Sequence, residues 1–263
     1  MSIRPAAVAS FALAILPAPA IRNAPVTTRY RIETKNETTV DLSGFGAPSQ
    51  QQNFTLVSWI AVTVSDTTAG RTVHVKVDSM TFGGNIAQLS QATADSAKGG
   101  TVHGFVDPGG RVKNLMANPQ NILLADVQGA IYAFFPRVKA GAKPGEAWSD
   151  TVEVTNTTNG ANVKSTFWIN YTSAGQESVA GIAALKLSAA SSANVTGTLE
   201  NPQMGTMEVE GKIKGNSTSL VAADGRYLGG SSNSTSDQLL KTAMAPGPIP
   251  VKTVRTSTIT LLP

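Results

Sequence analysis

The chain has 263 residues, only 14% of them are charged, and its formal net charge is +4. Lysine and arginine stand singly, without the basic stripe and interleaved aromatic residues of a nucleic-acid binder, so no nucleic-acid partner is expected. Cysteine is absent, which excludes disulfides, a cysteine-ligated zinc site and the acylated cysteine of a bacterial lipoprotein.

The first twenty residues have the pattern of an export signal. Arg4 supplies a positive charge, residues 6–16 form an apolar run, and Ala18 and Ala20 occupy the small-x-small positions of a cleavage site. The run is shorter than the about 20 apolar residues that a membrane span needs. We therefore predict a signal peptide over residues 1–20, cleaved near Ala20, and an exported product, periplasmic or extracellular. A retained signal and a buried first strand or helix are the alternatives.

Residues 21–263 are predicted to form a single β-rich domain, whose first half covers residues 26–117. Its strands are recognised by period-2 alternation, as in residues 71–77, where valine alternates with polar residues. Residues 83–100 are small and polar, and favour either a short helix or a mobile loop. The half contains two predicted hairpins, with strands 55–64 and 71–77 around a turn at 65–70, and strands 102–105 and 111–115 around Asp107-Pro108-Gly109-Gly110.

One amphipathic helix is predicted over residues 118–135, near the middle of the chain. Asn118 is the expected N-cap and Pro119 lies in the first turn. Apolar residues then recur at helical spacing from Leu123 to Phe134, and Pro136 ends the pattern.

The second half, residues 143–263, returns to strand patterns. Residues 229–250 interrupt the series, because Gly-Gly-Ser-Ser-Asn-Ser is followed by a candidate short helix to Met244 and a proline-rich linker. The halves are similar in order, which indicates a pseudo-repeat. The predicted strands are residues 148–155, 164–172, 181–189, 207–214, 217–222 and 251–261, with turns at Asn159-Gly160 and Asp224-Gly225.

Catalytic motifs are missing, and neither a metal nor a cofactor is expected. The sequence contains no His-Glu-x-x-His and no Gly-x-Ser-x-Gly. Its two histidines, His74 and His103, are interpreted as residues of the sheet surface. Glu208 and Glu210 share one face of a strand and are interpreted as a solvated face. The chain is therefore predicted not to be an enzyme.

The large apolar residues are expected mainly to build the core. A more specific hypothesis is that a strongly curved antiparallel sheet, a half-barrel or clam with the helix on its concave face, leaves an apolar cavity. We then expect contacts to an apolar ligand or partner from Trp59, Phe134 and Trp168.

Residues 138–152, with Lys-Pro-Gly-Glu-Ala-Trp-Ser-Asp, resemble a feature of uncharacterised exported bacterial β-proteins, in which a turn with proline and glycine leads into a tryptophan that starts the second half. The order of hairpins, central helix and further strands is also similar to periplasmic lipoprotein carriers and related lipid-binding clams. This resemblance implies an antiparallel half-barrel with an apolar interior and no catalysis. It assigns no functional residue.

Three functional hypotheses follow from the sequence. The first is a non-catalytic accessory or scaffolding protein that docks on a cell-envelope complex and touches the membrane only through that partner. The second is a periplasmic carrier of a lipid or other apolar ligand in a β-clam. The third is a hydrolase whose acids assemble from distant positions.

Overall fold

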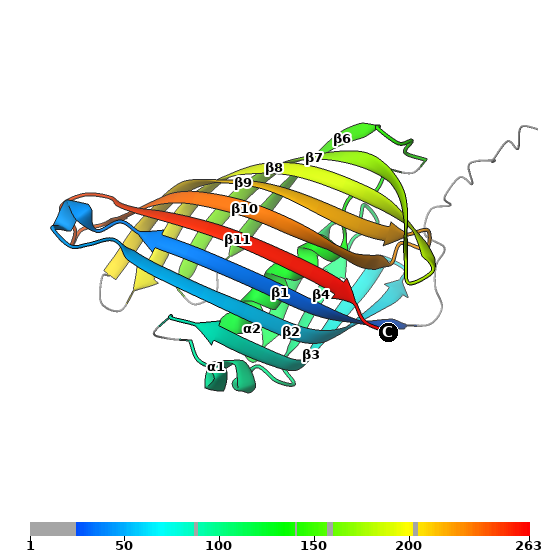
Figure 1. Cartoon of the computed structure of the whole chain (residues 1–263), viewed down its shortest axis with the longest axis horizontal. Helices are drawn as coiled ribbons and strands as arrows, with labels where there is room; N and C mark the ends of the chain where they lie inside the picture. The colour runs from blue at the N-terminus through cyan, green and yellow to red at the C-terminus, as the bar shows by residue number, and fades with distance from the viewer. Residues whose placement is uncertain (1–24, 87–88, 140, 157–159, 202–204) are drawn as a thin grey trace, which may run out of the picture.

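A single antiparallel sheet dominates the structure. The computed structural model describes residues 25–86, 89–139, 141–156, 160–201 and 205–263. The 11 strands form one sheet in the order β5-β4-β3-β2-β1-β11-β10-β9-β8-β7-β6, which curls into a half-barrel (Figure 1). The first-half strands are β1 (Val26–Val40), β2 (Gln50–Thr67), β3 (Gly70–Gly84), β4 (Thr101–Val106) and β5 (Val112–Asn118). The second-half strands are β6 (Ala147–Asn156), β7 (Ala161–Val179), β8 (Ile182–Asn201), β9 (Gly205–Ala222), β10 (Tyr227–Thr242) and β11 (Ile249–Leu261).

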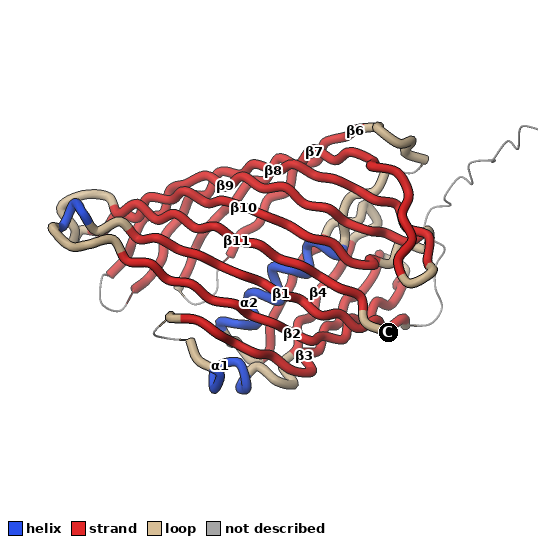
Figure 2. The backbone as a smooth tube through the Cα atoms, viewed as in Figure 1, coloured by secondary structure: helices blue, strands red, loops and turns tan. Residues whose placement is uncertain are grey.

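Each half is a meander, and the two halves join through β1 and β11. Tyr30 of β1 pairs with Leu261 of β11, and the ladder continues to the pair of Val40 with Val251. Between the halves the chain crosses the inside of the sheet as α2 (Ile122–Ile131) and the 3-10 turn η2 (Tyr132–Phe134), which Figure 2 shows as a helix running across the curved layer. The shorter elements η1 (Ser43–Phe45) and α1 (Gln91–Ser96) lie in connections.

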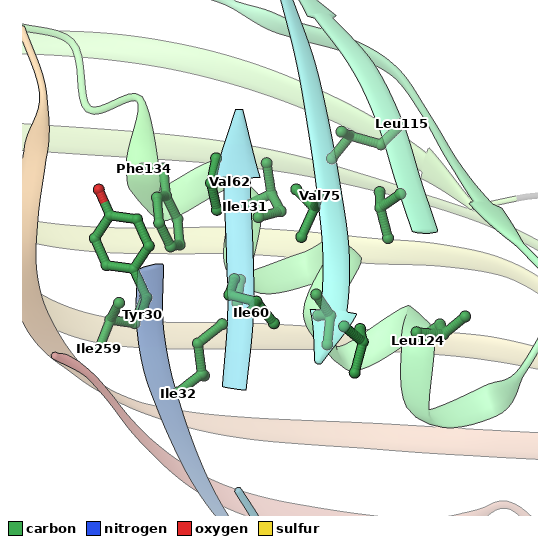
Figure 3. Close-up of a cluster of buried hydrophobic side chains, with 14 of the residues drawn as sticks. Tyr30, Ile32, Ile60, Val62, Val75, Leu115, Leu124, Ile131, Phe134 and Ile259 are labelled. Atoms are coloured by element: carbon green, nitrogen blue, oxygen red, sulfur yellow. The ribbon is translucent and has the colours of Figure 1, made fainter. Parts of the chain in front are cut away.

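The main core lies between α2 and the concave face of β1 to β4. Side chains alternate between the two faces of each strand, so Tyr30 and Ile32 of β1 point inward together with Ile60 and Val62 of β2. These side chains are buried in one apolar cluster with those of α2 (Figure 3). Leu124 and its neighbours bury one side of the helix, and this burial holds α2 against the sheet.

The two edge strands meet at one end of the half-barrel. Asp150 of β6 contacts Arg137 at 2.6 Å (Nη1 to Oδ1) and Arg111, just before β5, at 3.7 Å (Nη2 to Oδ1). Among the described residues no ladder joins β5 to β6. The Arg111–Asp150 pair therefore bridges the seam between the two edges of the sheet at this end.

Inward-facing glycines accompany the curl of the second half. A Cβ atom on Gly230 would lie 2.1 Å from the carbonyl oxygen of Thr218, and one on Gly211 would lie 2.6 Å from that of Asp237. Real Cβ atoms do not approach backbone so closely, so these positions allow neighbouring strands to bend toward each other.

The predicted fold class, a curved antiparallel sheet with one central helix, is confirmed. The turn at Asp107 is confirmed by the hydrogen bond from Gly110 N to Asp107 O, and the turn at Asp224 by the one from Gly225 N to Ala222 O. In residues 83–100 the short-helix alternative is the observed one, as α1. The signal peptide over residues 1–20 and Asn159 lie outside the described residues.

Two predicted boundaries are wrong. The helix does not begin at Asn118, because that residue still pairs with Thr101 in the β4–β5 ladder. Asn121 is the N-cap instead, and its side-chain oxygen accepts a 2.8 Å hydrogen bond from Leu123 N. The irregular segment predicted over residues 229–250 is also wrong as far as Thr242, since β10 runs to that residue and pairs with β9 and β11 on its two sides. Residues 243–248 do form the connection into β11.

Candidate functional site: the concave face

The concave face of β7 to β10 carries no charged side chain. The register identifies which residues point inward, because they align with the inward Ile32 and Thr34 of β1 across the sheet. None of the inward residues of these four strands is Asp, Glu, Lys or Arg. The charged residues of the same strands point outward, as Lys164, Glu210 and Lys214 do. This separation of charge between the faces is what an apolar environment on the concave side would require.

The inward residues are instead apolar or short and polar. At one end of the second half Val195, Val209 and Ile249 are buried. Nearer to α2, Phe167 and Ile169 of β7 are only half-buried. Apolar surface thus remains in contact with water on the inside of the sheet, at a free-energy cost of about 25 cal/mol for each Å².

The side of α2 that faces away from β1 to β5 is also apolar and uncovered. Ile122 is 55% exposed, and Ala125, Gly129 and Ala133 follow at helical spacing on the same side, all exposed. An exposed helix side normally carries charged or polar residues. The exposed side of α2 has none, and the helix itself lies within the curve of the sheet (Figure 2).

The single charged residue of α2 fixes the helix to the centre of the sheet. Asp126 accepts a hydrogen bond from Thr34 Oγ1 of β1 (3.1 Å to Oδ2) and pairs with Arg255 of β11 (Nη2 to Oδ1, 2.5 Å). Thr34 is fully buried. The carboxylate of Asp126 therefore neutralises the charge of Arg255, which is the inward-facing charged residue of β11, and the same contact attaches α2 to the sheet.

An aromatic cluster fills the concave face beyond the C-terminal end of α2. Tyr30 packs edge-on against Phe134 with ring centroids 4.7 Å apart, and its hydroxyl donates a 2.6 Å hydrogen bond to the carbonyl of Tyr227. Burial raises the pKa of Tyr30 to about 12 and also raises the pKa of Tyr227, so both stay neutral. A cavity of about 60 Å³ adjoins this cluster, well below the about 300 Å³ of a drug-sized pocket.

The structure does not bring the three predicted contact residues together. Phe134 is buried in the concave core. Trp59 and Trp168 alternate with inward residues along their strands and so point outward. Trp59 lies beneath Arg31, whose Cζ is 5.9 Å from the centroid of the indole ring. The side chain of Trp168 is 43% exposed. One cavity lined by all three is therefore ruled out. Contact of any one of them with a partner stays a prediction.

Residues considered for catalysis lie on the convex face. Glu208 and Glu210 are exposed, and Glu210 pairs with Lys241 at 3.2 Å (Nζ to Oε2). His74 and His103 face each other across β3 and β4, with their Nδ1 atoms 3.1 Å apart. The sequence could not show this contact, because it depends on the register of two strands.

Two further features were searched for within the described ranges. No group of three or more His, Asp or Glu side chains there is placed to hold a metal ion. Of the helices in the same ranges, none has the length and apolar character needed to cross a membrane.

No family model and no curated protein matches the sequence. Several solved structures are distantly similar. Lipovitellin, from a study of its lipid–protein interactions, aligns with a TM-score of 0.45 and 12% identity over 92% of this chain, which spans only 25% of the lipovitellin chain. DynF from the dynemicin biosynthesis pathway of Micromonospora chersina gives 0.25 and 12%, covering 98% of this chain and 92% of its own. Salmonella typhi OmpF in complex with daunomycin gives 0.31 and 8%, covering 89% and 97%.

Proposed function

We propose that the protein binds an elongated apolar molecule, such as a lipid acyl chain, on its concave face. The ligand lies between the uncovered side of α2 and the inward residues of β7 to β10. The observation that carries this proposal is that both surfaces are uncharged and partly exposed to water, while the charged residues of β7 to β10 point outward.

Burial of this surface supplies the binding free energy. A ligand that covers Ile122, Phe167 and Ile169 removes their apolar area from water, at about 25 cal/mol for each Å². The short side chains between them, such as Ser191 and Ser217, leave room above the sheet and require no counter-charge. A carrier that holds an uncharged chain is therefore favoured over a hydrolase.

The scaffolding hypothesis stays a prediction. A docking partner would also cover apolar surface, but the uncharged residues lie inside the curve of the sheet, where a slender ligand reaches them more easily than a folded protein does. The two hypotheses differ in what should co-purify with the protein. The carrier should co-purify with a lipid, and the scaffold with a protein subunit.

The direct test is binding of N-phenyl-1-naphthylamine, an uncharged apolar fluorophore, followed by its fluorescence enhancement. Ser191→Asp places a carboxylate on the concave face, and Ser192→Asp places it on the convex face one residue later. We expect Ser191→Asp to weaken binding at least about tenfold, because a charge must lose its hydration beside the ligand. Ser192→Asp should bind like the wild type.

A second pair of variants guards against misfolding of Ser191→Asp. Ile122 on α2 and Met116 on β5 are both largely exposed, at 55% and 70%, so Ile122→Asp and Met116→Asp should both fold. Only Ile122→Asp should weaken binding. Absence of any fluorescence enhancement with the wild type, or equal binding by Ile122→Asp and Met116→Asp, would overturn the proposal.

A further inference from the structure

A polar groove lies on the opposite, convex face of the second half. Most of its lining comes from outward positions, which form two rows at matching heights across five neighbouring strands, β7 to β11. Between the two rows the groove also contacts four residues at inward positions, which are Ala189, Ser217, Ser232 and Ser257. The groove has a volume of about 650 Å³. It is a hollow because the side chains that line it are short, among them Asn170, Thr172, Asn216, Thr218, Asn233 and Thr256.

The lining of the groove is uncharged and rich in hydrogen-bonding groups. It contains Ser, Thr and Asn with two alanines, and no Asp, Glu, Lys or Arg. Within the described residues, the side-chain amides of Asn216 and Asn233 make no hydrogen bond. Asn170 accepts one from Ser149 Oγ at 2.8 Å, which leaves its amide hydrogens available. These donors and acceptors recur at the strand spacing of about 4.8 Å across the sheet.

An exposed tryptophan stands beside the groove. Trp168 occupies the outward position on β7 next to that of Asn170, and its side chain is 43% exposed. Large aromatic side chains are usually more buried than this, and an exposed ring offers an apolar face next to polar groups. Trp59, the other outward tryptophan, is half-buried beneath Arg31 and is far from β7 in the strand order.

We propose that this groove binds a neutral polysaccharide chain. Sugar hydroxyls both donate and accept hydrogen bonds, which matches an array of hydroxyl and amide side chains. The apolar C–H face of a sugar ring can stack on the exposed indole of Trp168. An anionic glycan or a nucleic acid is disfavoured by the lack of Lys and Arg in the lining, and an acyl chain by its polarity.

The test is isothermal titration calorimetry of the full chain with three neutral hexasaccharides, which are maltohexaose, cellohexaose and hexa-N-acetylchitohexaose. We expect at least one to bind with a dissociation constant between about 10 µM and 1 mM. Trp168→Ala should weaken that binding about tenfold or more, through loss of the stacking surface. The matched variant Trp59→Ala should bind within about twofold of the wild type.

A second variant keeps the test independent of Trp168. The double variant Asn216→Ala with Asn233→Ala removes two exposed amides from the groove, and its binding of the hexasaccharide should also be lost. Titration of N-phenyl-1-naphthylamine into both groove variants should match the wild type, because that probe reports on the concave face and on folding. Failure of all three hexasaccharides to bind, undiminished binding by Trp168→Ala, or tighter binding of a heparin hexasaccharide would each overturn the proposal.

Discussion

The contact of Asp126 with Arg255 and Thr34 predicts how strongly α2 is held to the sheet. Asp126→Asn keeps the shape of the side chain but removes the negative charge that faces Arg255 at 2.5 Å. The Asp126 side chain is 11% exposed and that of Arg255 is 36% exposed. The pair therefore lies between a buried pair, whose disruption costs about 3–5 kcal/mol, and a surface pair worth about 0–1 kcal/mol.

We expect Asp126→Asn to lower the free energy of unfolding by about 2 kcal/mol, the range for a hydrogen bond to a charged group. In a chain of this size that corresponds to a fall in Tm of about 4–8 °C. Urea denaturation followed by circular dichroism measures the free energy directly.

A double-mutant cycle separates the ion pair from other effects of the substitution. Arg255→Gln leaves the charge of Asp126 unpaired, and Asp126→Asn leaves the charge of Arg255 unpaired. The double variant has no unpaired charge at either position. We therefore expect a coupling energy of at least about 1 kcal/mol between the two positions. If the two single costs add to within about 0.5 kcal/mol, the ion pair does not hold α2 in place and the reasoning fails.

Two further predictions concern the sheet itself. Gly230→Ala should lower the free energy of unfolding by about 1–3 kcal/mol in urea denaturation, because its Cβ would meet the backbone of Thr218 at 2.1 Å. Gly83→Ala should have no effect, because a Cβ there would meet nothing within 4 Å. Equal stability of the two variants would contradict the role given to the inward glycines in the curl of the sheet. Burial, and then the nearby positive charges, hold the pKa of His74 below 6.5, so the unfolded chain binds more protons there and stability should fall as the pH drops below about 6.5. Tm measured from pH 7.5 to 5.5 should show that loss, a His74→Gln variant should show less of it, and identical pH profiles would refute the assignment.

The fold class was predictable because it depends on local alternation. The alternating valines of residues 71–77 indicate one strand, and the turn at Asp107 indicates the hairpin of β4 and β5, each without reference to the rest of the chain. β10 was missed because Gly-Gly-Ser-Ser-Asn-Ser has little intrinsic strand preference. It is a strand because β9 and β11 supply partners on both sides. Propensity within the segment carries no information about those neighbours.

The candidate site was predictable only in outline. A helix on a concave face followed from the apolar spacing between Leu123 and Phe134. The direction of Trp59 did not, because Leu-Val-Ser-Trp-Ile-Ala-Val is apolar at most positions and does not distinguish the two faces of its strand. The contact of Asp126 with Thr34 and Arg255 joins three distant segments, so no local pattern records it.

The pairing of β1 with β11 has a consequence for how the chain folds. Each meander is built from hairpins between consecutive strands, whose loops close at little entropic cost. The central ladder instead joins Tyr30 to Leu261, so it requires almost the whole described chain. During synthesis the first meander and α2 can therefore form before β11 is available, with the outer edge of β1 unpaired until the last strand arrives. Exposed strand edges invite pairing with other chains, so the interval before β11 docks is when the nascent protein is most vulnerable to aggregation.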